Sequence, residues 1–198
     1  MCWRRLEIMS TNSNLTGKAP IRYEGDVLYV DELSLAEFAR WAETPFYLYS
    51  KKAFLQALKG WKKAVEGLPA LITFALKAND NLRLLELVAA EGLGADVVSG
   101  GELFLARKAG IPAERIVFAG VGKQAKEIRA ALEQGVRSLN VESQSELRLI
   151  NRIAGELGVA APVNIRINPD IDPKSHPYIS TGLAENKFGL PLGQAKAV

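Results

Sequence analysis

The chain has 198 residues, of which 48% are hydrophobic and 24% are charged, and its formal net charge is +3. This composition is typical of a soluble globular protein, and the length allows one or two domains. The single cysteine, Cys2, excludes a disulfide framework within the chain. The basic residues are spread through predicted helices rather than clustered, which argues against nucleic acid as a partner.

The N-terminal region contains no predicted targeting or membrane segment. No apolar run approaches the roughly 20 residues that cross a bilayer, and the first residues lack the apolar core of a signal peptide. We therefore expect a cytoplasmic protein. Residues 1–20 are expected to form a disordered tail, in which Met9 is an alternative start. Residues 21–45 form a separate segment, in which Ser34 is expected to cap a helix through Trp41.

Strand-like and helix-like patterns alternate over residues 46–198, which we expect to form one domain. The predicted strands lie near Phe46–Tyr49, Leu71–Lys77, Ala95–Val98, Ile116–Ala119, Ser138–Val141 and Val163–Ile167. The predicted helices are Lys52–Val65, Leu82–Glu91, Gly101–Ala109, Lys123–Gln134 and Ser145–Leu157. Equivalent strand positions recur after 21, 21, 22 and 24 residues, at Lys77, Val98, Ala119, Val141 and Ile165. Such regular units predict a parallel sheet with right-handed crossovers.

Two α/β architectures accommodate six strands: an open doubly wound sheet, or part of an eight-stranded barrel. No Gly-x-Gly-x-x-Gly motif follows the first strand, which counts against a dinucleotide-binding sheet, and the even repeat favours a (β/α)8 TIM-like barrel. A complete barrel needs eight strands and about 250 residues. We therefore expect about six of the eight strands here, in the N-terminal piece of a longer protein. An unclosed barrel exposes its strand edges, so this piece is expected to be poorly soluble.

Lys77 follows the apolar run Leu71–Leu76 and precedes turn-like residues. Alternation along the strand directs Thr73, Ala75 and Lys77 to one face, which would be the lumen of a barrel. A desolvated lysine at the carboxyl end of a strand is a candidate nucleophile for Schiff-base formation. The alternative is a surface lysine that ends a strand and extends to water.

Other polar residues are expected at the same rim of the barrel. They belong to the segments Asp96–Glu102, Gly120–Lys123, Asn140–Ser143 and Arg166–Asp170. An arginine in a barrel needs acidic partners, and Asp96 or Glu102 is expected to pair with Arg166. Glu102 also stands three residues after Ser99, the spacing of a helix capping box.

His176 is the only histidine, and it lies between Pro173 and Pro177 in a predicted rim loop. With no second histidine and no nearby cysteine, we expect no metal site. His176 is either structural or a contact of the substrate region.

Several motifs together resemble the diaminopimelate decarboxylase family of fold-type III pyridoxal-phosphate enzymes. They are Phe74–Asn79, Asp96–Leu103, Asn140–Ser143, Arg166–Asp170, His176–Gly182 and Asn186–Gly189. The last two distinguish this family from the ornithine and arginine decarboxylases of the same fold. The resemblance runs from about Ile21 to the end of the chain.

The resemblance implies a pyridoxal 5'-phosphate cofactor and the decarboxylation of meso-2,6-diaminopimelate to L-lysine, the last step of lysine biosynthesis. Lys77 matches the lysine that links covalently to the cofactor, and Asp96, Glu102 and Arg166 match an acid–base network around it. The family has a barrel followed by a β-rich domain, and it usually forms homodimers. Its phosphate-binding loop and substrate-binding residues would lie beyond Val198, so the chain alone is expected to be inactive.

Three other interpretations remain open. One is an ornithine, arginine or carboxypolyamine decarboxylase of the same fold. Another is a catalytically silent homologue that binds a protein partner, although such a protein would not need Lys77. The third is a lysine aldolase that works without a cofactor.

Overall fold

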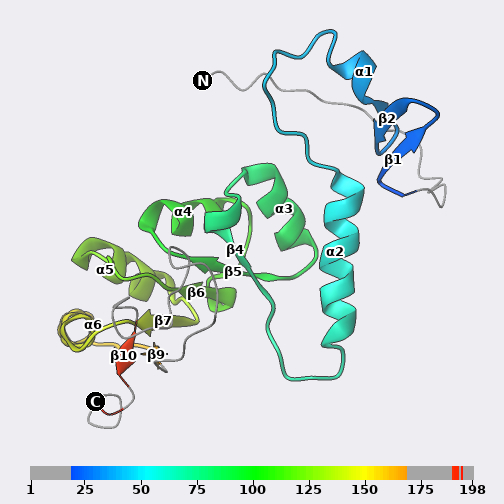
Figure 1. Cartoon of the computed structure of the whole chain (residues 1–198). Coiled ribbons are helices and arrows are strands. Elements are labelled where there is room, and N and C mark those ends of the chain that lie inside the picture. The colour runs from blue at the N-terminus through cyan, green and yellow to red at the C-terminus, as the bar shows by residue number, and fades with distance from the viewer. Residues whose placement is uncertain (1–18, 169–188, 192, 194–198) are drawn as a thin grey trace. The chain divides into compact units, whose positions relative to one another are not determined.

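The computed structural model describes residues 19–168, 189–191 and 193. The chain divides into two compact units, Met1–Ala57 and Leu58–Val198, and the boundary falls within helix α2 (Lys51–Ala64). Figure 1 shows the elements of both units in chain order. Each unit is described separately.

The first unit contains a small antiparallel sheet of three strands in the order β1-β2-β3. Strand β1 (Ile21–Glu24) pairs with β2 (Val27–Val30) across a tight turn, and β3 (Leu33–Ser34) pairs with β2. After β2, Asp31 accepts a hydrogen bond from the Ser50 hydroxyl at 2.6 Å, while the Ser50 Oγ accepts one from the amide of Ala53 at 2.9 Å. This pair fixes the start of α2 to the end of the sheet.

Two predictions in this unit are wrong. Ser34 does cap a helix, because its Oγ accepts from the Glu37 amide, but helix α1 (Leu35–Phe38) has only four residues. The amides of Arg40 and Trp41 turn back to carbonyls three residues earlier, so the chain tightens instead of continuing as an α-helix. Residues 46–49 form no strand in the described structure. Their burial alternates as in a strand, but they pair with no described strand.

The second unit is built on a five-stranded parallel sheet with the order β4-β5-β6-β7-β8. Its strands are β4 (Thr73–Ala75), β5 (Gly94–Val97), β6 (Ile116–Phe118), β7 (Ser138–Val141) and β8 (Val163–Ile165). Each strand pairs with the next one along the chain, as in the wall of a barrel; a doubly wound sheet would reverse its order. This order confirms the α/β class and the barrel type.

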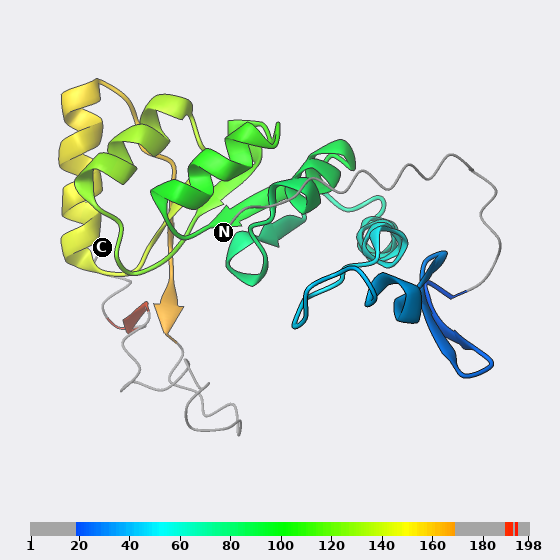
Figure 2. The same cartoon turned by 90° about the horizontal axis from the view of Figure 1, so that it is seen from above.

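Four helices connect these strands and lie along one side of the sheet (Figure 2). They are α3 (Leu82–Ala90), α4 (Gly100–Lys108), α5 (Ala125–Gln134) and α6 (Gln144–Leu157). The short 3-10 helices η1 (Leu76–Ala78) and η2 (Ala113–Arg115) follow β4 and precede β6. Beyond β8, strand β9 (Ile167–Asn168) pairs in parallel with β10 (Leu190–Pro191).

The two faces of the sheet differ in chemistry. On the helix side, Ala95, Val97, Phe118 and Leu139 are fully buried and form the core with apolar residues of the helices. Register and alternation place Ala75, Asp96, Val117, Ser138 and Asn140 on the opposite face. The sheet therefore has one apolar face and one face that carries polar groups.

Glycine is required at one close approach within the sheet. A Cβ atom on Gly94 would lie 2.2 Å from the carbonyl oxygen of Arg115, so no other residue fits without a backbone shift. By contrast, Gly135 and Gly158 end α5 and α6 in the left-handed conformation that favours glycine.

Candidate active site at the carboxyl edge of the sheet

Lys77 lies directly after β4, at the carboxyl edge of the parallel sheet. The strand ends at Ala75, two residues earlier than predicted, and Lys77 is the middle residue of η1. Leu76 is buried in the core, whereas Lys77 is exposed. The side chain of Asn79 then accepts a hydrogen bond from the amide of Asn81, which itself caps α3. This turn presents the Lys77 amine to solvent at the end of the sheet where α/β enzymes place their chemistry.

Asp96 lies on the next strand and is half-buried on the polar face. It is aligned with Ala75 of β4 on one side and with Val117 of β6 on the other. Burial raises the pKa of the Asp96 carboxyl, while the positive charges of Lys77 and Arg166 act in the opposite direction. Of the four residues expected around the cofactor, Lys77 and Arg166 are therefore close enough to Asp96 to interact with it electrostatically.

Glu102 has a local structural role. The Ser99 Oγ accepts a hydrogen bond from the Glu102 amide at 3.2 Å, and Glu102 Oε2 accepts one from the amide of Val98 at 2.8 Å. The capping interaction predicted from the sequence is confirmed, although the glutamate reaches the residue before the N-cap rather than the N-cap itself. Glu102 thereby joins the end of β5 to the start of α4.

Arg166 follows β8, and the described carboxylate to which it donates differs from the two expected. Its Nη1 donates to Glu142, at 3.1 Å from Oε1 and 3.4 Å from Oε2. The expectation of a direct pair with Asp96 or Glu102 is wrong in this respect, although Asp96 remains in electrostatic range. The physical reason is strand order: β7 adjoins β8, so a carboxylate at the end of β7 is the first that Arg166 reaches.

Glu142 is the functional candidate that sequence reasoning did not single out. It directly follows β7, and its side chain is 3% exposed, so the pair with Arg166 is shielded from water on the glutamate side. Its signal in the sequence was only its place in the predicted rim segment Asn140–Ser143. Nothing in the local pattern indicated which rim cation it would bind.

A second ion pair lies beneath this rim and is more deeply buried. The Nζ of Lys123 donates to Glu146 Oε1 at 2.8 Å, and the exposed fraction of the lysine side chain is 0%. The sequence placed Lys123 in a rim segment but assigned it no role.

His176 and Asp170 were also placed at this rim by the sequence, and both lie outside the described residues. Within residues 19–168, 189–191 and 193, no cluster of histidine, cysteine, aspartate or glutamate could hold a metal ion. No helix in the described part of the chain combines the length and the apolar run that a membrane crossing requires.

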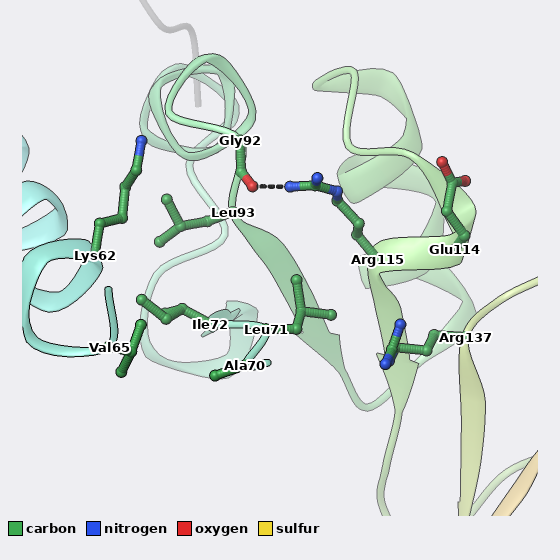
Figure 3. A pocket seen from close by; sticks show the side chains of 10 residues that line it. All are labelled: Lys62, Val65, Ala70, Leu71, Ile72, Gly92, Leu93, Glu114, Arg115 and Arg137. Carbon is green, nitrogen blue, oxygen red and sulfur yellow. Dashed lines mark hydrogen bonds between the residues drawn. The ribbon is translucent and has the colours of Figure 1, made fainter. Parts of the chain in front are cut away.

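A hollow of about 410 Å³ opens at the other end of the strands (Figure 3). Its lining comes from segments that precede β4, β5, β6 and β7, and includes Leu71, Leu93 and three basic residues. Of these, Lys62 donates to the carbonyl of Glu91, and Arg115 donates to that of Gly92. None of the predicted site residues lines this hollow, so the candidate chemistry belongs to the carboxyl edge.

Residues 51–198 match the family described as "Pyridoxal-dependent decarboxylase, pyridoxal binding domain". The chain belongs to this family. The family is defined by a pyridoxal-binding domain, and the residues at the carboxyl edge fit such a cofactor. Lys77 offers an accessible amine to an aldehyde, and the neighbouring carboxylate and guanidinium supply charges of both signs.

Several relatives that the chain resembles are diaminopimelate decarboxylases. The chain is 47% identical over 176 residues to a diaminopimelate decarboxylase of Aquifex aeolicus, covering 89% of this chain and 41% of the relative. It is 55% identical over 153 residues to one of Helicobacter pylori, covering 77% and 38%. A crystal structure of the Helicobacter pylori diaminopimelate decarboxylase complexed with L-lysine superimposes with a TM-score of 0.78 at 52% identity, covering 81% of this chain and 41% of that one. The chain thus spans about two fifths of the length of the curated relatives it matches.

Proposed function

We propose that this chain supplies the cofactor-holding lysine and its charged neighbours to a pyridoxal-phosphate-dependent decarboxylase of meso-2,6-diaminopimelate. In this reaction one carboxylate leaves as carbon dioxide, a proton takes its place on the same carbon, and L-lysine is formed. The observation that carries the proposal is the position of Lys77 at the carboxyl edge of the sheet, where its positive charge interacts with the Asp96 carboxyl. The similarity to several diaminopimelate decarboxylases supports the choice of substrate.

Each residue has a distinct proposed role. Lys77 would hold the cofactor through its amine. When bound, pyridoxal phosphate supplies an electron sink for the pair left by the departing carbon dioxide. Asp96, between the charges of Lys77 and Arg166, would set the charge balance beside that amine. Arg166, fixed by Glu142, would keep one positive charge at the rim.

Glu102 and His176 have further proposed roles. Glu102 would act from the start of α4, where its carboxylate is already bound to the Val98 amide. His176 is proposed as a contact of the substrate region on the sequence alone. By the resemblance described above, the full-length protein would be a cytoplasmic homodimer that acts on a small molecule, and neither nucleic acid nor a membrane would be a partner.

The test uses the full-length protein, purified with pyridoxal phosphate. We would record its visible absorbance, reduce it with borohydride, map the labelled peptide and assay meso-diaminopimelate. We expect the label on Lys77, L-lysine as product, and loss of both in the K77A variant. A matched K108A variant, which removes an exposed lysine from the last turn of α4, should behave like the wild type.

A panel of substrates distinguishes between the alternative functions. Ornithine, arginine and a carboxylated polyamine are assayed beside diaminopimelate, and faster turnover of any of them would replace the proposed substrate. A colourless protein would instead favour the silent homologue, or a cofactor-free aldolase if borohydride still traps a substrate on Lys77. The 198-residue chain is assayed in parallel and is expected to form no lysine.

A further inference from the structure

Lys123 is a buried lysine that the proposed chemistry does not use. It lies between β6 and α5, and the exposed fraction of its side chain is 0%. Its Nζ donates to the carbonyl of Gly120 at 2.7 Å, to that of Asn140 at 2.6 Å, and to Glu146 Oε1 at 2.8 Å. All three N–H groups of the ammonium are therefore satisfied, and one carboxylate balances its charge.

Glu146 extends this interaction towards the rim. Its second oxygen, Oε2, accepts a hydrogen bond from the backbone amide of Glu142 at 2.7 Å. The Glu146 amide in turn donates to Ser143 Oγ at 3.2 Å, so the carboxylate is fixed at the start of α6. One side chain thus holds Lys123 with one oxygen and the backbone of Glu142 with the other.

Glu142 carries the connection to Arg166. Its backbone is held by Glu146, and its own carboxylate, 3% exposed, accepts from the Arg166 guanidinium. Lys123 also binds the carbonyl of Asn140, two residues before Glu142 on the same segment. The direction of the Glu142 side chain is therefore set from two sides by contacts that start at Lys123.

We propose that Lys123 is a positioning residue for the Glu142–Arg166 pair and acts on it through Glu146. A buried ion pair that only filled the core could be replaced as a whole by apolar side chains, often without loss of stability, whereas removal of Lys123 alone leaves the Glu146 carboxylate without its cation. The structure assigns Lys123 a more specific task, since its three acceptors belong to the turn after β6, to β7 and to α6. The proposal deepens the proposed function and rests on it, because the rim matters for catalysis only if it holds the cofactor.

The experiment compares three variants of the full-length protein. K123M keeps an unbranched side chain, one atom shorter than that of lysine, and removes all three hydrogen bonds. E146Q leaves a single acceptor oxygen, which cannot serve both Lys123 and the Glu142 amide. K126M is the matched control, because Lys126 lies three residues further along, in α5, and is exposed.

Two measurements are independent of turnover. The first is equilibrium binding of pyridoxal phosphate to the cofactor-free protein. We expect K123M and E146Q to weaken binding by about tenfold, by analogy with the loss found when the hydrogen-bonded partner of a metal ligand is removed, and K126M to bind like the wild type. The second is the side-chain NMR signal of Arg166 in 15N-arginine-labelled cofactor-free protein, assigned by its loss in R166K. We expect it to shift in K123M and E146Q and not in K126M.

A double-mutant cycle with E142Q distinguishes positioning from simple stabilisation. If Lys123 acts through Glu142, the losses of the two substitutions should not add. The K123M/E142Q double variant should then bind the cofactor with the same affinity as whichever single variant has the lower affinity. Independent losses that multiply, or an Arg166 signal that stays unchanged while only the melting temperature falls, would overturn the proposal. If K123M does not fold, E146Q and its cycle with E142Q decide the question alone.

Failure of the proposed function would look different. A wild-type protein that binds no pyridoxal phosphate would refute the proposed function, while the Arg166 signal would still show whether Lys123 positions the pair. A wild type that binds the cofactor and forms lysine, with K123M and E146Q indistinguishable from K126M in both measurements, would refute only the role of Lys123.

Discussion

Arg166 is attached to β7 at two points: its backbone amide donates to the carbonyl of Val141 at 3.0 Å, and its guanidinium donates to the carboxylate of Glu142. The two contacts come from consecutive residues, since Val141 ends the neighbouring strand and Glu142 directly follows it. A charged side chain held in this way keeps a defined direction even though 42% of its surface is exposed. The positive charge of Arg166, which interacts with the Asp96 carboxyl, therefore has a fixed position at the rim.

Replacing Glu142 with alanine should impair the rim more than the rest of the fold. We expect E142A to lower the decarboxylase activity of the full-length protein at least tenfold, because the Arg166 guanidinium loses the buried Glu142 carboxylate to which it donates. The free energy of unfolding should fall by about 1.5–3 kcal/mol, the usual contribution of a hydrogen bond to a charged group. Steady-state kinetics and urea unfolding measure the two effects. E114A is the control, since Glu114 is exposed in η2, before β6; equal losses in both variants would contradict a specific role.

The close approach at Gly94 predicts a large effect from one methyl group. Because the new Cβ would lie 2.2 Å from the Arg115 carbonyl, G94A should lower the free energy of unfolding by about 3 kcal/mol through overpacking. In G155A, by contrast, the added methyl meets no atom within 4 Å in the interior of α6, and alanine should stabilise that helix by about 0.5–1 kcal/mol. Denaturant unfolding of both variants checks the prediction, and a tolerated G94A would show that the sheet relaxes at β5.

The pH dependence of stability should carry a contribution from Asp96. Burial raises the folded-state pKa of this carboxyl above its ordinary value of 3.8. Between 3.8 and the raised pKa, the folded state binds more protons than the unfolded state, so stability falls as the pH rises through this window. The asparagine side chain of D96N does not ionise, so the stability of this variant does not fall with rising pH for this reason. Relative to the wild type, D96N should therefore gain stability as the pH increases from about 3.8 to 7. Urea midpoints across this range measure it, and a constant difference between the proteins would contradict the assignment.

The carboxyl of Glu156, on the surface, should change the pH dependence of stability in the opposite direction to that of Asp96. Hydrogen bonds from Arg152 and Arg129 lower the pKa of its carboxyl below the ordinary value of 4.5. The contribution to stability is therefore present above pH 4.5 and is lost as the pH falls through the lowered pKa. E156Q should lower the melting temperature slightly near pH 7 in low salt, because Arg129 of α5 and Arg152 of α6 lose their shared partner. At about 1 M salt, where the screening length is about 3 Å, the difference should disappear. An effect that persists in high salt would indicate packing rather than charge.

Most of the second unit was predictable from the sequence because its signals are local. The helix from Leu82 begins at an asparagine cap, and the helices after Ser99 and Ser143 follow the serine–glutamate spacing of a capping box. These features depend on residues within one turn of each other, which a pattern can capture. The strand order then follows from the regular spacing of the βα units.

The parts that were not predictable depend on contacts between distant segments. The strand near Phe46–Tyr49 has the right alternation, but alternation does not supply a neighbour with which to pair. The pair between Arg166 and Glu142 depends on which rim carboxylate lies nearest after the strands are in register. Lys123 reads as an ordinary helix-start lysine in the sequence, and only the closure of β7 and α6 around it makes it buried.

The double attachment of Arg166 to β7 means that the candidate site assembles only when β8 joins the sheet. Lys77 lies in η1, directly after β4, and Asp96 lies on β5. Strands β4 and β5 pair with each other at the far end of the strand order, so the arrangement of the lysine and the aspartate does not require β8. A transient opening of the β7–β8 ladder would remove the guanidinium and leave the lysine and the aspartate in place. Hydrogen exchange at the Arg166 amide, which donates to Val141, would therefore report the fraction of molecules in which the three charges are assembled.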